Sequence, residues 1–190
     1  MTVLELIQKR RTVRKFSQKP LTTEQLTRWV DAARMAPSGA NLQPLKYAAV
    51  CDPETVKNIF PLLKWAGYLA PEYDPKPGER PTAYIVVCAD TFIRKTGFEA
   101  DAGAAVENLI LAALEEGVGA CWIGSVDRPA LKALLQLPEG LVITHVVALG
   151  YPAEDPEAVT AEDGNIRYYL EDETLRVPKR PLEEVLIAVR

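Results

Sequence analysis

The chain has 190 residues, 48% of them apolar and 25% charged, which predicts one globular domain, or one domain plus an arm, and argues against a wholly disordered chain. Its apolar runs are too short to span a bilayer, and the N-terminus has no secretion signal, so we expect a cytoplasmic protein outside the membrane. The net charge of −4 is uneven: residues 1–15 hold five cations and one carboxylate, which leaves −8 on the rest. The acidic body argues against nucleic-acid binding, and the basic cluster favours a small anion as ligand.

Two capping boxes, Thr2–Glu5 and Thr22–Gln25, each predict the start of a helix in the first forty residues. The first helix runs into the basic cluster, and Pro37 ends the second. Leu45–Val50 is typical of a strand, and Asp52 followed by Pro53 predicts the start of a third helix.

The second half of the chain begins with a proline-rich segment, residues 64–82, which we interpret as a lid, a binding loop or disorder. Ala83–Ala89 then predicts a buried strand, and an apolar stripe along Glu99–Glu116 predicts a long helix with Gly117 at its C-terminal cap. The remaining expected elements are a strand at Val118–Ile123, a helix at Arg128–Leu135 and a strand at Leu141–Leu149. Because strands and helices do not strictly alternate, the order favours an α+β fold with a mixed sheet.

The last forty residues are acidic and contain four prolines, with little periodicity before Leu182–Ile187. A free tail is one interpretation. However, the segment keeps many apolar side chains, which favours an arm that packs on another surface, such as a second subunit.

Cysteine and histidine offer little chemistry in this sequence. Cys51, Cys88 and Cys121 are far apart and form no CxxC pair, which argues against a zinc or iron–sulfur site. Each lies among apolar neighbours, as buried thiols do. The only histidine, His145, falls in a predicted strand, where a structural role is the usual one, so we expect neither a metal site nor a histidine-based triad.

Two polar segments in the first quarter of the chain are candidates for ligand binding. The segment Arg10–Phe16 offers guanidinium groups and the Thr12 hydroxyl to a phosphate, although cations are also common at an exposed helix end. The segment Ala36–Pro44 can present amides and hydroxyls to the edge of a heterocycle, or it can be an ordinary connection.

Two later segments carry weaker signals. Gly117–Ser125 contains a GxG, but Trp122 takes the place of the third glycine, which argues against a dinucleotide-binding turn. Gly124, at a strand end, can instead bring backbone close to a ligand. Lys179 and Arg180 restore positive charge within the acidic tail, or they are a surface pair before a helix.

Taken together, these segments resemble the FMN-dependent nitroreductase family. The family motif Arg-Arg-Ser-x-Arg-x-Phe corresponds to Arg10–Phe16, with threonine in place of serine. The motif Ala-Pro-Ser-x-x-Asn-x-Gln-Pro-Trp corresponds to Ala36–Pro44, followed here by Leu45 instead of tryptophan. Three further motifs of the family match Asp101–Leu109, Gly117–Gly124 and Lys179–Val185, and the matches span nearly the whole chain in the expected order.

The resemblance implies an α+β homodimer with a mixed, mainly antiparallel central sheet flanked by helices. Residues 1–150 would form the FMN-binding core, and residues 151–190 would be an exchanged C-terminal arm on the partner subunit. Each FMN would lie at the subunit interface.

The resemblance also implies a set of FMN contacts. Arg10, Arg11 and Thr12 would hold the phosphate and ribityl chain, with Lys179 or Arg180 completing the phosphate clamp. Arg14 would lie near flavin N1 and the C2 carbonyl. The flavin ring would be lined by Pro37, Ser38 and Gly39 of the other subunit, with Asn41 as a further contact. The backbone of Trp122, Ile123 and Gly124 would approach flavin O4 and N5.

The implied reaction is ping-pong hydride transfer from NAD(P)H through flavin N5 to a small electron-poor acceptor, such as a nitroaromatic or a quinone. No protein acid or base is required, because the flavin carries the chemistry. We expect Trp65, Tyr68 and Tyr73 of the proline-rich segment to shape the acceptor side. The alternatives are a same-fold FMN enzyme with other chemistry (reductive dehalogenation, dehydrogenation or flavin fragmentation) and a non-catalytic binding protein.

Overall fold

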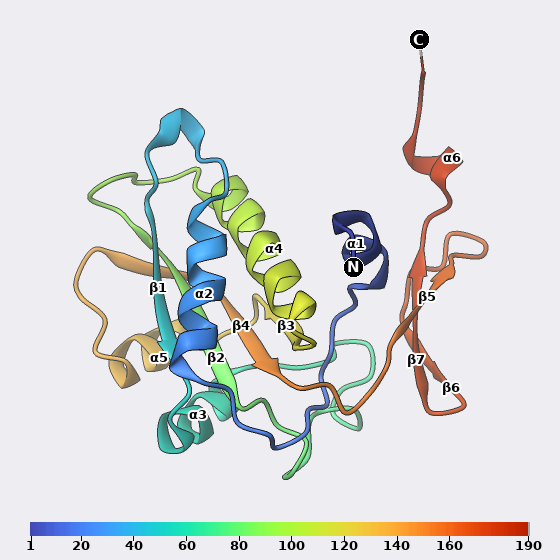
Figure 1. Cartoon of the computed structure of the whole chain (residues 1–190), viewed down its shortest axis with the longest axis horizontal. Helices are drawn as coiled ribbons and strands as arrows, with labels where there is room; N and C mark the ends of the chain where they lie inside the picture. The colour runs from blue at the N-terminus through green and yellow to red at the C-terminus, as the bar shows by residue number, and fades with distance from the viewer. Residues whose placement is uncertain (190) are drawn as a thin grey trace.

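The computed structural model describes residues 1–189 and is built around one antiparallel sheet of four strands (Figure 1). The strand order is β1-β2-β4-β3, and the strands span Leu45–Val50 (β1), Ala83–Asp90 (β2), Leu141–Gly150 (β4) and Gly119–Ile123 (β3). Helices cover both faces, as the expected α+β fold requires. Within residues 1–189, no helix is both long and apolar enough to cross a membrane.

The two faces of the sheet carry separate apolar cores because side chains alternate along the central strand β2. Ile85 and Val87 pack toward α2 (Thr23–Arg34) and α4 (Glu99–Glu115). Tyr84 and Val86 pack on the other face, toward α3 (Pro53–Ile59) and α5 (Arg128–Leu134). Short 3₁₀ turns, η1 (Gly39–Asn41) and η2 (Phe60–Leu62), follow α2 and α3.

The structure confirms most elements that the sequence predicts. Both capping boxes form, at the starts of α1 (Val3–Lys9) and α2, and Asp52 caps α3. The predicted strands and helices from Leu45 to Gly150 agree with the structure to within one residue at each predicted end, whereas α2 ends at Arg34, before the predicted stop at Pro37. Residues 64–82 consist of turns and extended chain without a helix or strand, as expected.

The region after Gly150 contains structure that the sequence does not predict. A second, three-stranded sheet forms in the order β5-β7-β6, with β5 at Glu157–Thr160, β6 at Tyr169–Glu171 and β7 at Thr174–Lys179. The turn between β6 and β7 is built by Asp172 and Glu173, both with positive φ, rather than by the Asn-Gly pair that signals such hairpins. Leu175 of β7 is buried in the core of its own chain, so part of this extension packs on the chain that carries it.

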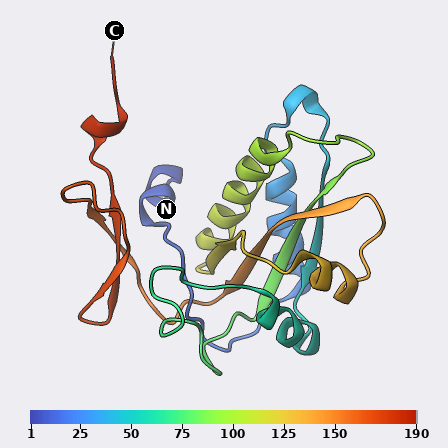
Figure 2. The same cartoon turned by 180° about the vertical axis from the view of Figure 1, so that it is seen from behind.

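After β7, the short helix α6 (Leu182–Val185) and the end of the chain extend away from the body, as Figures 1 and 2 both show. Apolar side chains on this arm and on α1 are strongly exposed. They are Met1, Val3, Leu4 and Ile7 on the N-terminal side and Leu182, Val185, Leu186, Ile187 and Val189 on the arm.

The segment that follows α1 lies directly against one end of the central sheet. Thr12 bridges to Ala120 of β3, and Phe16 bridges to Pro152, just beyond β4. The contact is close because the facing sheet residues, Gly119 and Gly150, are paired glycines. A Cβ on Gly119 would lie 2.8 Å from Val13 Cγ2, and a Cβ on Gly150 would lie 2.8 Å from Phe16 Cδ1.

One carboxylate fixes this crossing segment to the rest of the molecule. Glu154, which follows β4, accepts hydrogen bonds from the backbone N–H groups of Arg14 and Lys15 and from the hydroxyl of Tyr73. Burial, and then the hydrogen bond to Glu154, raise the pKa of Tyr73, so the phenol stays protonated and remains a donor. Three segments far apart in the sequence therefore meet at one side chain.

We predict that Gly150→Ala destabilises the protein by about 1–3 kcal/mol, because the new methyl group must displace the fully buried ring of Phe16. The matched control is Gly67→Ala, since a Cβ there meets nothing within 4 Å. The free energy of unfolding from urea denaturation measures both effects. Equal stability of the two variants would contradict the close approach.

Candidate functional site

A cluster of three cations lies where the end of α1 meets the end of β7. Arg10 and Arg11 follow α1, and Lys179 is the last residue of β7. Burial lowers the pKa of the Lys179 ammonium, and the neighbouring charges of Arg10 and Arg11 lower it further. Glu107 of α4 pairs with Arg10, with 3.2 Å between Nε and Oε1. One carboxylate against three cations leaves the cluster strongly positive.

Arg11 is held by two hydrogen bonds to backbone carbonyls, but one of its N–H donors has no acceptor among the described residues. Its Nη2 donates to the Gln8 carbonyl at 2.8 Å, and Nη1 donates to the Arg10 carbonyl. Its Nε is buried and has no hydrogen-bond partner within the described residues. Burial, followed by the charge of Arg10, lowers the pKa of Arg11. Arg10 and Arg11 line a cavity of about 200 Å³ that runs along α4 to Gly117.

Arg14, three residues further on, lies over the ring of Tyr168, which in turn packs against Tyr68. Its guanidinium carbon lies 4.8 Å from the ring centroid of Tyr168, and the Tyr68 ring lies 4.8 Å from the same ring. The backbone N–H of Tyr68 donates to the Tyr168 hydroxyl at 3.1 Å. Arg14 Nε is also buried without a partner among residues 1–189. The sequence predicts Arg14 and Tyr68 as site residues. It does not indicate Tyr168, because only the folding of the C-terminal extension brings that ring beside Arg14.

The three aromatic residues expected on the acceptor side differ in exposure. Tyr68 has 51% of its side chain exposed, whereas Trp65 and Tyr73 are buried at 5% and 4%. Trp65 stacks on Phe60 with 5.5 Å between ring centroids, and Tyr73 bonds Glu154. Of the three, only Tyr68 offers substantial surface to another molecule.

The end of β3 carries the predicted backbone contacts. Ile123 is buried, while Trp122 is partly exposed and meets His145 edge to face at 5.2 Å between ring centroids. Arg128 donates to the Gly124 carbonyl at 3.0 Å and to two carbonyls of β4. The sequence does not indicate this role. Burial, and then the charge of Arg128, lower the pKa of His145, so its imidazole is neutral at pH 7.

The second predicted segment forms a loop anchored on the first turn of α4. The Ser38 hydroxyl donates to Asp101 at 2.6 Å, and the Gly39 N–H donates to the other Asp101 oxygen at 3.2 Å. Burial raises the pKa of Asp101, but the bonds from Ser38 and Gly39 and the charge of Arg94 lower it by more, so its pKa lies below the ordinary value. Asp101 interrupts the apolar stripe of α4, a signal by which the sequence could have revealed it.

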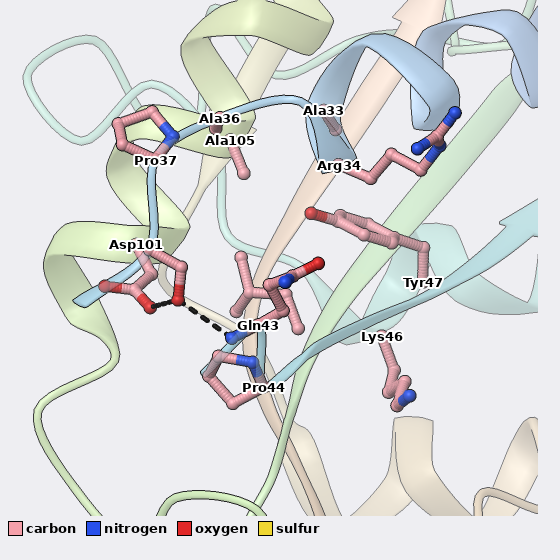
Figure 3. A pocket seen from close by; sticks show the side chains of 12 residues that line it. Ala33, Arg34, Ala36, Pro37, Gln43, Pro44, Lys46, Tyr47, Asp101 and Ala105 are labelled. Carbon is pink, nitrogen blue, oxygen red and sulfur yellow. Dashed lines mark hydrogen bonds between the residues drawn. The ribbon is translucent and has the colours of Figure 1, made fainter. Parts of the chain in front are cut away.

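This loop has an unusual backbone and borders its own cavity. Ala40, Asn41 and Gln43 all have φ near +50°, a conformation that costs energy in non-glycine residues and clusters at functional sites. Figure 3 shows Pro37, Gln43 and Asp101 around a cavity of about 210 Å³. Asn41 itself is exposed.

The two groups of predicted residues lie along different parts of α4. Asp101 holds the Ser38 loop at the first turn, whereas Glu107 holds Arg10 and the cavity beside Arg11 extends to Leu114. At 1.5 Å per residue, the helix separates Asp101 from Glu107 by roughly 9 Å and from Leu114 by roughly 20 Å. The structure thus brings Arg10, Arg11 and Lys179 together, whereas the Ser38 loop lies at the first turn of α4. Arg180 pairs with Glu184 of α6 instead.

Comparison with known proteins identifies relatives over most of the chain. Residues 7–151 match the Nitroreductase family. A protein of Archaeoglobus fulgidus, provisionally named as an NADH dehydrogenase/NAD(P)H nitroreductase, is 34% identical over 84% of this chain and 91% of its own. The NADPH-flavin oxidoreductase of Vibrio harveyi is 30% identical over 81% of this chain and 67% of its own.

A solved structure shares the fold. The FMN-dependent nitroreductase of Clostridium difficile superposes with a TM-score of 0.69 at 23% identity, over 89% of this chain and 98% of that one. The family match covers the central sheet, both of its helical faces and the segments that carry Arg10, Arg11 and the Ser38 loop. The chain therefore belongs to the nitroreductase family of oxidoreductases.

Proposed function

We propose that the protein is an FMN-dependent NAD(P)H oxidoreductase that acts as a homodimer on a small electron-poor acceptor. The observation that carries the proposal is the cluster of Arg10, Arg11 and Lys179, which holds more positive charge than Glu107 can neutralise. Family membership and the flavin named in two of the relatives support the same cofactor.

The residues present fit the phosphate end of FMN. A phosphate group would supply acceptors for the buried Nε of Arg11 and would offset the repulsion that lowers the pKa of Lys179. Guanidinium groups suit phosphate because their N–H donors form a fork. Of the two cations proposed from the late motif, Lys179 is the better candidate, because Arg180 is already paired with Glu184.

The residues further along the segment fit the ring end. Arg14 keeps a buried Nε without a partner among residues 1–189, and Thr12 lies beside Ala120 of β3. The partly exposed Trp122 and the backbone of Ile123 and Gly124 form the adjacent strand end, which Arg128 holds in place.

When bound, FMN would accept a hydride from NAD(P)H and pass electrons to the acceptor. The chain's own contribution is to bind and orient. Arg14 would hold positive charge near the flavin ring, and the exposed Tyr68 would border the acceptor side. Trp65 and Tyr73 support the loop that carries Tyr68. His145 is neutral and stays a packing partner of Trp122.

Two observations support a homodimer. The Ser38 loop and the cation cluster lie along different parts of α4, so a ligand that needs both would take them from two chains. The apolar side chains of α1 and of the C-terminal arm are exposed, with Ile187 at 95%. Exposed apolar surface of this kind marks interaction sites. We propose that Pro37, Ser38, Gly39 and Asn41 of one subunit face the cations of the other.

We predict that the purified protein, reconstituted with FMN, shows the visible absorbance of a bound flavin. Under anaerobic conditions NADH or NADPH should bleach that absorbance, and a nitroaromatic or a quinone should restore it. A protein that binds no FMN would contradict the proposal, and bound FMN that neither nucleotide reduces would favour a storage role.

We predict that Lys179→Ala weakens FMN binding by about tenfold or more, because it removes a charged contact to phosphate. Riboflavin, which lacks the phosphate, should bind both proteins equally, and Lys76→Ala is the control for loss of an exposed lysine. Fluorescence titration measures the affinity of the wild-type protein and of both variants for FMN and for riboflavin. An equal loss for riboflavin would place Lys179 away from the phosphate.

We predict that a double variant, Val185→Glu with Ile187→Glu, is monomeric by light scattering and loses FMN binding, because charge cannot be buried in an apolar interface. Val142→Glu, on a partly exposed position of β4, is the control. A wild-type protein that binds FMN as a monomer would contradict the shared site.

A further inference from the structure

A third cavity lies between α3 and the end of the loop of residues 64–82, on the face of the sheet that carries α3. Its volume is about 270 Å³. Its walls include the apolar side chains of Val56 and Phe60 and three prolines, and its polar lining includes Arg80, Thr82 and Tyr84. None of these residues belongs to the FMN site proposed above.

Three buried polar groups at this cavity have no hydrogen-bond partner among residues 1–189. They are Arg80 Nε, Thr82 Oγ1 and Tyr84 Oη. The Tyr84 side chain is fully buried, at 0% exposure. A buried donor without a partner costs about 1–3 kcal/mol, so three at one cavity are unusual unless something else satisfies them.

The charge at the cavity is positive. The Arg80 guanidinium lies over the Phe60 ring, with its carbon 4.0 Å from the ring centroid, and Lys57 is a second cation on the rim. Among the described residues that line the cavity, none is acidic. This balance disfavours a cation as occupant, and a neutral molecule would leave the half-buried Arg80, with its buried Nε, without a counter-charge.

We propose that this cavity binds a small organic carboxylate with an apolar body about the size of one ring. The carboxylate would accept from the Arg80 guanidinium, whose parallel N–H donors match its two oxygens. Thr82 and Tyr84 would donate to the remaining lone pairs. The apolar body would pack against Val56 and Phe60.

The cavity is lined by the C-terminal end of the loop that carries Tyr68 and is linked to the start of that loop through Phe60. Arg80 lies at the C-terminal end of the loop, and Phe60 stacks on Trp65 at its start. An occupant therefore joins the two ends, and its binding should slow amide hydrogen exchange in residues 64–82.

Benzoate tests the proposal on the full chain loaded with FMN, with amide NMR to locate the binding. We expect shifts that centre on Val56, Thr82 and Tyr84, and nitrobenzene, which has a similar shape without the charge, should bind there at least about tenfold more weakly. Arg80→Gln should weaken benzoate by about tenfold or more. Absence of shifts at these residues, or equal affinity for nitrobenzene, would overturn the proposal.

A comparison of two tyrosines separates a ligand site from a structural one. Tyr84→Phe should weaken benzoate severalfold and leave the melting temperature without benzoate unchanged or raised, because its hydroxyl has no partner to lose. Tyr73→Phe is the control: its buried hydroxyl bonds Glu154, so it should melt lower and keep its benzoate affinity. If Tyr84→Phe melts lower, its hydroxyl serves the fold and the proposal fails.

Discussion

The arrangement of the whole molecule depends on a close backbone approach at one end of the central sheet. Gly119 and Gly150 face each other there, and the absence of two Cβ atoms lets the segment after α1 lie against the strands. Val13 and Phe16 fill the space with buried side chains. With these two turned inward, Arg10, Arg11 and Arg14 remain outside the core, at the point where β3 begins. The GxG that resembles a nucleotide-binding turn therefore serves packing in this protein.

The hydrogen bonds around this contact link distant parts of the chain. Glu154 joins the crossing segment to Tyr73 of the proline-rich loop, and Tyr168 of the extension lies between Arg14 and Tyr68. A charged acceptor that is shared by three donors stabilises more than separate neutral bonds do. The cations are thus held by the fold before any ligand arrives, which reduces the ordering cost of binding.

Helix α4 organises the rest of the site by its length. Asp101 in its first turn remains ionised despite burial, because it accepts from Ser38 and Gly39 beside Arg94. These hydrogen bonds offset the free-energy cost of the positive-φ residues that follow Ser38 and Gly39 in the loop. Glu107, two turns on, holds Arg10. A straight helix fixes the distance between the two groups, and in the homodimer proposed above the loop of one subunit would face the cations of the other.

Sequence alone determined the elements whose signals are local. Capping boxes, the continuous apolar run of β2 and the stripe of α4 each depend on neighbours within a few residues, and those predictions hold. The order of motifs was enough to indicate the family, which the match over residues 7–151 confirms.

The tertiary structure decided the features that depend on contacts between residues far apart in the sequence. It showed the sheet of β5, β6 and β7, and it placed Lys179 rather than Arg180 beside Arg10 and Arg11. It also showed that Asp101, Arg128 and Tyr168 contact the predicted site residues. It also separated Tyr68, which is exposed, from Trp65 and Tyr73, which are buried, because burial is set by the whole fold and leaves no mark in a proline-rich sequence.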